Sequence, residues 1–237
     1  MSKQKAKRGQ RHQTLSFLLA AIVLLLLIGW IVALGVPAPA ESLVSAKPTP
    51  RGLTPRDGVC DAATMQTMID TYAEMNTPLV FTCNENIELL TGLNIKGDVT
   101  IVGQNPELRS FRVFINGNDY AERLFYVESD ASLTLVSVEL TRSHLYGIYA
   151  TPGSQVTLDN VVFTSISEGR NIGAAIYNEG GAIVISNSFF SMSWGEVAIK
   201  NSGQLWLDDT VIWSSVGCVD NSADATAHGV SEACKAS

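Results

Sequence analysis

From residue 124 onward, short alternations of apolar and polar residues return along the chain at intervals of about 22–27 residues. Each repeat holds three such triplets, which begin at Phe125, Leu133 and Val138 in the first repeat. The matching triplets of the later repeats are 148–150, 156–158 and 161–163, then 176–178, 183–185 and 188–190, then 199–201, 205–207 and 210–212. Because successive side chains of a strand point to opposite faces, each triplet predicts a short strand whose middle residue faces outward.

Three strands per repeat, separated by polar or glycine-containing turns, predict a three-faced coil. A single coil cannot bury its apolar edge alone, so successive coils stack and share one core. Independent hairpins would also produce alternation, but they would not return the triplets in the same order four times. The pattern therefore predicts a stack of about five parallel coils.

The segment before the repeats combines one helix with further strands. Apolar residues of Asp61–Met75 recur every three or four positions, which is typical of one buried helical face. Asp61 is a suitable N-cap, and Pro78 stops the helical pattern. Three apolar strands are expected next, at 79–83, 92–95 and 99–102.

Two runs carry a more specific resemblance. Gly173–Phe190, which contains Ala-Ile-Tyr-Asn-Glu-Gly-Gly-Ala-Ile-Val-Ile, and Ala198–Leu207 resemble the repeats of right-handed parallel β-helix proteins. They are similar to the GGAIYN-type repeats of bacterial polymorphic outer-membrane and adhesin-like proteins, within the pectate-lyase-like superfamily. The resemblance covers about residues 57–221 and implies an all-β fold, a short right-handed parallel β-helix.

The same resemblance implies structural roles. Helix 61–75 would cap the N-terminal end of the apolar column. Two ladders of structural turn residues are expected. The first comprises Ser137, Asn160, Asn187 and Asp209, and the second consists of asparagines, Asn178, Asn201 and Asn221. The tail 222–237, tied back by a Cys218–Cys234 bond, would shield the last coil from edge-to-edge pairing.

The N-terminus carries a membrane signal. Residues 15–36 form a 22-residue stretch without a charged side chain, and roughly 20 apolar residues span a bilayer as a helix. Five basic residues precede this stretch, which places a basic segment, 1–14, in the cytoplasm. A transmembrane helix at 15–36 is thus expected to precede the β-helix, with the body extracytoplasmic at the cell membrane.

The alternative is a signal peptide cleaved after Ala40, since Ala38-Pro39-Ala40 resembles a small-x-small site, which would make the protein secreted. A retained anchor is favoured, because the apolar stretch is longer than a signal peptide requires. Proline-rich residues 37–56 then form a linker, and 57–237 the β-helix domain.

The four cysteines fit an oxidising compartment. Cys60, Cys83, Cys218 and Cys234 form two local pairs at opposite ends of the body, without the CxxC spacing of a zinc site. Three pairings are possible, and buried free thiols are the remaining alternative. Proximity in sequence favours Cys60–Cys83 and Cys218–Cys234.

Charge restricts the class of partner. The net charge is −7, and beyond the basic N-terminal segment 11 Lys and Arg face 23 Asp and Glu, a balance of −12. Such a body repels nucleic acid and anionic lipid. No nucleic-acid partner is expected.

Residues with catalytic potential are sparse. The resemblance implies that an enzyme on this fold, a polysaccharide lyase or a related hydrolase, would carry clustered acids with Lys, Arg or His-Gly elements. The nearest matches are Asp208-Asp209, His228-Gly229 and Lys200. Asp208 and Asp209 are expected in a solvated turn, and His228 in the tail outside the coils. His144 has no second metal ligand nearby in the sequence. No catalytic residue, metal or cofactor is therefore predicted.

Two outward columns are candidates for binding. The third-face triplets stack Tyr126, Tyr149, Tyr177 and Lys200, and aromatic rings on a flat face can lie against sugar rings. The alternative is that tyrosine simply suits an exposed strand position. The second column, Val162, Phe189 and Val211, is apolar, and the linker, a loop or a partner is expected to cover it; three tryptophans near the same coils could extend it, Trp194, Trp206 and Trp213.

These patterns favour a non-catalytic, membrane-anchored module that binds an envelope polysaccharide or a cell-envelope protein. A small polysaccharide lyase or glycoside hydrolase on the same fold is the first alternative. A structural or assembly domain is the second.

Overall fold

The structure is a computed structural model that describes residues 60–104, 112–167, 172–192, 195–214 and 217–235. The basic segment 1–14, the predicted membrane segment 15–36 and the linker 37–56 lie outside these residues. Within the described ranges no helix has both the length and the hydropathy that a membrane crossing requires.

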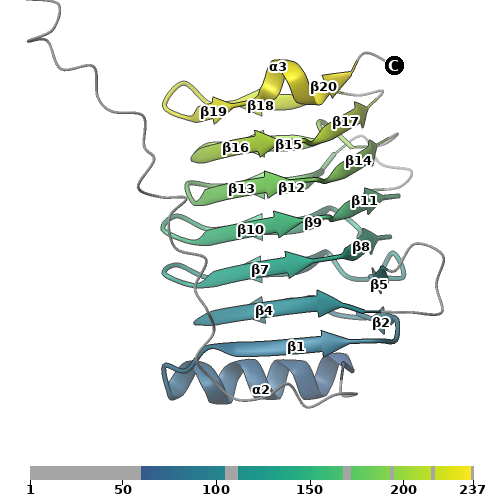
Figure 1. Cartoon of the computed structure of the whole chain (residues 1–237), viewed down its shortest axis with the longest axis vertical. Coiled ribbons are helices and arrows are strands. Elements are labelled where there is room, and N and C mark those ends of the chain that lie inside the picture. The colour runs from purple at the N-terminus through teal and green to yellow at the C-terminus, as the bar shows by residue number, and fades with distance from the viewer. Residues whose placement is uncertain (1–59, 105–111, 168–171, 193–194, 215–216, 236–237) are drawn as a thin grey trace, which may run out of the picture. The chain divides into compact units, whose positions relative to one another are not determined.

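The described chain opens with helix α2, Ala62–Glu74, as the apolar spacing predicted. The side chain of Asp61 accepts a hydrogen bond from the Thr64 amide (3.0 Å) and so caps the first turn. Met65 and Ile69 are fully buried on the face toward the first strands. Figure 1 shows α2 lying across one end of the strand stack, which confirms the capping role that the resemblance implied.

Three parallel sheets run the length of the stack, and we name them sheets A, B and C. Sheet A comprises β1 (Leu79–Cys83), β4 (Asp98–Gly103), β7 (Ser132–Val136), β10 (Gln155–Asp159), β13 (Ala182–Ser186), β16 (Gln204–Asp208) and β19 (Thr226–His228). Sheet B comprises β2 (Ile87–Glu88), β5 (Val113–Asn116), β8 (Val138–Thr141), β11 (Val162–Thr164), β14 (Phe189–Met192), β17 (Val211–Ser214) and β20 (Cys234–Lys235). Sheet C comprises β3 (Leu93–Ile95), β6 (Arg123–Val127), β9 (Tyr146–Ala150), β12 (Ala174–Asn178), β15 (Ile199–Asn201) and β18 (Val219–Asn221). A four-residue helix, α3 (Val230–Ala233), precedes β20.

The parallel solenoid has about six turns, so the expectation of about five coils was too low. Two sources of strands were missed. Strands β2 and β5 lie before the regular repeats: β2 has only two residues, and β5 buries alternate side chains but falls outside the repeats that begin at residue 124. The tail was expected only to shield the last coil, but β19 and β20 pair with β16 and β17 and form a further turn.

A single apolar column fills the interior. Strand after strand buries alternate side chains, as in the pattern buried–half-buried–buried of β1. Aromatic side chains from successive coils also stack inside, with the rings of Phe163 and Phe190 4.4 Å apart and nearly parallel. Each coil therefore packs mainly on its neighbours, as stacked repeats require.

The first turn ladder is confirmed by backbone geometry. Ser137, Asn160, Asn187 and Asp209 precede the sheet B strands and all have left-handed φ angles, between 42° and 56°. Asparagine and aspartate adopt this conformation more readily than other non-glycine residues. In three coils the following strand begins one residue later than the sequence predicted, at Val162, Phe189 and Val211.

The asparagine ladder is also confirmed. The Asn178 amide donates to Asn201 Oδ1 (2.8 Å), and the Asn201 amide donates to Asn221 Oδ1 (2.9 Å). Asn178 and Asn201 are buried, and their oxygens accept from the backbone of Gly181 and Gly203. The ladder thus satisfies polar groups inside the turns and links the last three coils.

Disulfides close both ends of the solenoid. Cys60 pairs with Cys83, joining the start of α2 to β1, and Cys218 pairs with Cys234, joining the last turn of sheet C to β20. The Cα atoms lie 5.7 and 5.9 Å apart, respectively. These are the two pairings that proximity in sequence favoured, and the described residues contain no free cysteine.

Candidate functional site

The outward face of sheet C carries the predicted column. Strand pairing aligns Tyr126 with Tyr149, Tyr149 with Tyr177, and Tyr177 with Lys200. The same register continues to Asn94 below and Asp220 above. We call Tyr126, Tyr149 and Tyr177 the tyrosine column; its placement was correctly predicted, because the middle residue of each triplet faces outward.

The rings of the column stack on one another. The Tyr149 and Tyr177 centroids lie 4.9 Å apart with a 16° angle between the ring planes, and the Tyr126 and Tyr149 centroids lie 5.5 Å apart. Such stacking covers much of each inner ring face with the neighbouring ring. Sugar rings would therefore meet the ring edges and the phenol hydroxyls, and not the inner ring faces as the sequence suggested.

Two further residues, which the triplet pattern does not include, complete this face. Tyr146 lies edge-on to Tyr149 (5.7 Å) and tilted against Tyr177 (5.3 Å), and its strand partner is Arg123. Both precede a column tyrosine by three residues, a spacing that the triplets did not include. Two consecutive residues of each strand, such as Leu124 and Phe125, are buried, which shifts the preceding residue back to the outside.

Cations lie at both ends of the column. The Arg123 guanidinium carbon is 4.4 Å from the Tyr126 ring centroid and 5.6 Å from that of Tyr149. Lys200 Nζ is 5.9 Å from the Tyr177 centroid and pairs with Glu196 at 3.3 Å. The hydrogen bond to Glu196 raises the pKa of Lys200. The rings thus stabilise two positive charges through their electron-rich faces.

Carboxylates surround the column as well. The Tyr149 hydroxyl donates a hydrogen bond to Glu179 Oε2 (3.1 Å). Partial burial, followed by this hydrogen bond, raises the pKa of Tyr149 to about 12. Burial also raises the pKa of Tyr146. Both phenols are therefore protonated near neutral pH and can donate hydrogen bonds.

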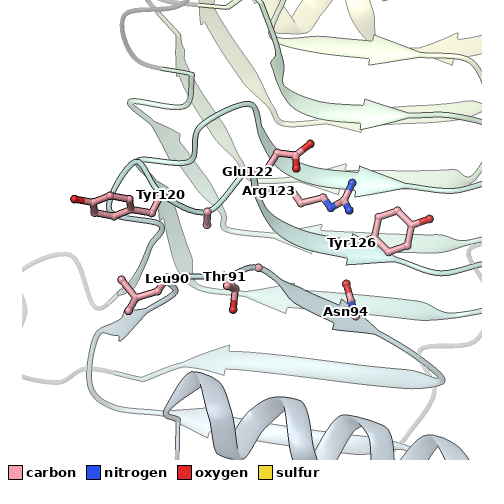
Figure 2. A pocket seen from close by; sticks show the side chains of 9 residues that line it. Leu90, Thr91, Asn94, Tyr120, Glu122, Arg123 and Tyr126 are labelled. Atoms are coloured by element: carbon pink, nitrogen blue, oxygen red, sulfur yellow. The ribbon is translucent and has the colours of Figure 1, made fainter.

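A pocket of about 310 Å³ opens at the Tyr126 end of the column (Figure 2). Figure 2 shows Arg123 extending toward Tyr126, with Glu122 beside it and Asn94 below. The full lining is Leu90, Thr91, Gly92, Asn94, Tyr120, Ala121, Glu122, Arg123 and Tyr126. We call this the Arg123 pocket; its lining brings two tyrosines together with a guanidinium, a carboxylate, an amide and a hydroxyl group.

The residues considered for catalysis lie on different faces. Lys200 projects from sheet C, whereas Asp208 and His228 belong to sheet A and Asp209 is an exposed turn residue. His228 was expected outside the coils; instead it lies in β19, and its ring stacks on Trp206 (5.8 Å). No group of three or more His, Cys, Asp or Glu close enough to hold a metal occurs in the part of the chain that the structure describes. His144 is half-buried.

The second predicted column is only partly apolar surface. Val162 is buried (8% exposed), Phe189 is half-buried, and Val211 is exposed at 36%. Trp213 extends this face with 55% exposure, but Trp206 was wrongly grouped with it, because Trp206 lies on sheet A. Trp194 lies outside the described residues, as does the linker, which was one of three expected covers of the column beside a loop and a partner.

Comparison with known protein families agrees with this architecture. A family model described as a right handed beta helix region matches residues 123–231, which begin at β6 and end within α3. The chain is a right-handed β-helix repeat protein. Comparisons with curated proteins and with solved structures give no match. The finer resemblance of this β-helix protein to pectate-lyase-like and GGAIYN-type proteins stays a prediction.

Proposed function

We propose that this β-helix protein is a membrane-anchored, extracytoplasmic module that binds a cell-envelope polysaccharide without cleaving it. The observation that carries the proposal is the sheet C face, where three stacked tyrosines lead into the Arg123 pocket. Stacked rings hold their hydroxyls in a rigid row along the solenoid. A rigid row loses little side-chain entropy when a ligand binds, which favours affinity for an extended chain.

The polar groups on this face suit saccharide hydroxyls. Phenols donate and accept hydrogen bonds, while Asn94 and Glu179 add amide and carboxylate partners. Aromatic edges and the exposed ring of Tyr120 provide apolar contact area for the C–H faces of sugars. A polysaccharide chain lying along the column would meet one tyrosine per coil.

The anchoring part of the proposal rests on the sequence. The uncharged 22-residue stretch 15–36 and the basic residues before it are typical of a single-pass anchor with a cytoplasmic N-terminus. The two disulfides of the body fit an oxidising, extracytoplasmic environment.

A double substitution, Tyr149→Ser with Tyr177→Ser, tests the binding face. The full-length chain, purified in detergent with its disulfides formed, is incubated with a panel of neutral and acidic polysaccharides, with and without calcium. Retained protein and newly formed chain ends are both measured. We expect retention by at least one polysaccharide, no new chain ends, and at least about a tenfold loss of affinity in the double variant, since two hydrogen-bonding rings are removed.

Trp213→Ser provides the matched control, because it removes an exposed aromatic side chain from sheet B. Binding should be unchanged in this control. Equal binding by the double variant and the wild type would contradict a role for the tyrosine column. New chain ends would instead identify an enzyme, and absence of retention by every polysaccharide would favour a protein partner or a structural role.

A further inference from the structure

Arg123 differs from the other basic side chains that the structure describes. Lys96 pairs with Asp70 (3.0 Å), Arg142 with Asp119 (2.6 Å) and Lys200 with Glu196 (3.3 Å). Arg112 donates hydrogen bonds to Asn160. Among the described residues, the Arg123 guanidinium has no ion-pair or hydrogen-bond partner, although the body is strongly acidic.

This guanidinium is nevertheless held in a defined place. It lies over the Tyr126 ring at 4.4 Å and near the Tyr149 ring at 5.6 Å, and it lines the Arg123 pocket. An arginine carries five N–H donors in a planar fork that matches a carboxylate. A positioned fork with unused donors, facing a pocket, is a ready site for one carboxylate.

The surrounding charges restrict which anion can bind. Glu122 lines the same pocket, and Glu179 and Asp220 lie along the sheet C face. These carboxylates would repel a polymer that carries a negative charge on every unit. An isolated carboxylate on an otherwise neutral chain meets Arg123 at one point and avoids most of this repulsion.

We infer that the Arg123 pocket binds a single acidic sugar of a largely neutral polysaccharide, with the sugar carboxylate on the Arg123 guanidinium. The sugar hydroxyls then face Asn94, Thr91 and the Tyr126 hydroxyl, while the neutral remainder of the chain follows the tyrosine column. A volume of about 310 Å³ suits one such unit, at the lower end of ordinary ligand pockets. This inference rests on the proposed polysaccharide-binding function and names its ligand class.

Three probes distinguish recognition of a single carboxylate from recognition of neutral sugars and of a polyanion. They are a neutral oligosaccharide ending in one glucuronate, the same oligosaccharide with its carboxyl reduced to a primary alcohol, and a polyuronate. Affinities for the full-length chain are measured by calorimetry. We expect the glucuronate probe to bind at least about tenfold more tightly than its reduced form, because charge-assisted hydrogen bonds are the stronger ones. The polyuronate should bind more weakly per uronate unit than the glucuronate probe.

Matched variants assign the effect to the pocket. Arg123→Gln should lower affinity for the glucuronate probe about tenfold and leave the reduced probe unchanged. Arg142→Gln removes the same charge from an exposed ion pair elsewhere and should change neither affinity. Glu122→Gln should raise affinity for the polyuronate, because it removes a repelling carboxylate. Unfolding transitions of each variant establish that the fold is retained.

Equal binding of the glucuronate and reduced probes, or an Arg123→Gln variant that binds the glucuronate probe like the wild type, would overturn the inference. Polyuronate binding as tight per unit as the glucuronate probe would overturn the single-carboxylate part. If binding to neutral polysaccharides persists in these cases, the proposed function survives without the inference. If no saccharide binds the wild type, both fail.

Discussion

Single residues in this protein have structural and chemical roles, and the residues at the turn positions show the structural one. Asn160 and Asn187 adopt left-handed φ angles of 56° and 51°, and their side chains reach the neighbouring coil through Ser137 and Asp159. Asparagine tolerates this backbone conformation, and its amide can bridge coils. The sequence could predict this role because residue type and position within the repeat together determine it.

The chemical role of a side chain was harder to predict, and Tyr149 shows why. Its place in the column follows from alternation, but its hydrogen bond to Glu179 joins residues 30 positions apart in sequence. Which ring face stays open depends on how close the neighbouring rings come. Local pattern contains no information on that distance.

Tyr149→Phe should remove part of the alkaline pH dependence of stability. The Tyr149 pKa is raised to about 12 in the folded protein, against about 10 for an ordinary tyrosine in the unfolded chain. The folded state therefore holds this proton more tightly, so the stabilisation is complete below about pH 10 and is lost as the pH rises to about 12. Denaturant midpoints measured across that range should fall more steeply in the wild type than in Tyr149→Phe.

Tyr120→Phe is the control, since its side chain is 78% exposed. That variant should follow the wild type across the same pH range. Parallel curves for Tyr149→Phe and the wild type would show that the folded protein holds the Tyr149 proton no more tightly than the unfolded chain does.

At the level of elements, regular repeats were predicted more accurately than irregular ones. The expected sheet A triplets coincide with strands β7, β10, β13 and β16, whereas β2 and β5 were not expected. Strand β2 has two residues and derives its conformation from pairing with β5. Short strands of this kind are produced by their neighbours, so their own sequence carries little signal.

The disulfides stabilise elements at the ends of the stack. A Cys218→Ser, Cys234→Ser double variant loses the closure of a loop with a sequence separation of 16, which corresponds to about 3 kcal/mol in loop-entropy terms. Because each coil contacts mainly its neighbours, the loss should be local. Hydrogen exchange should accelerate in β18, β19 and β20 and stay nearly unchanged in β4 and β7.

The corresponding double variant of Cys60 and Cys83 gives the mirrored control. Its exchange should accelerate in α2 and β1 at the other end. Uniform acceleration along the whole solenoid in either variant would show that the coils unfold as one unit and not locally.

At the scale of the whole molecule, the two ends of the described solenoid differ: a helix covers the first strands, whereas β18, β19 and β20 are the edge strands of the last turn. Helix α2 lies across the first strands, and α3 with β20 forms the last turn (Figure 1). Parallel strands at the end of a stack would otherwise present unpaired backbone groups to other chains. The helix α2 therefore protects the first strands from edge-to-edge pairing.

The anchor prediction also belongs to this scale. When the chain is expressed in bacteria, we expect it in the membrane fraction, resistant to high salt and released by detergent, because 15–36 can span the bilayer. The mass of the purified protein should include residues 1–40. A soluble product beginning at Glu41 would show cleavage after Ala40 and a secreted protein instead.

The sequence by itself determined the parallel coils, the capping helix, the turn ladder and the alignment of Tyr126, Tyr149 and Tyr177. These features repeat with a period or depend on neighbouring residues, so a linear pattern records them. Only the tertiary structure decided that the tyrosine rings cover one another, and that Arg123 lies on Tyr126 beside a pocket with no ion-pair or hydrogen-bond partner among the described residues. Each of these depends on distances between residues of different coils, which strand register and loop paths set and local sequence does not encode.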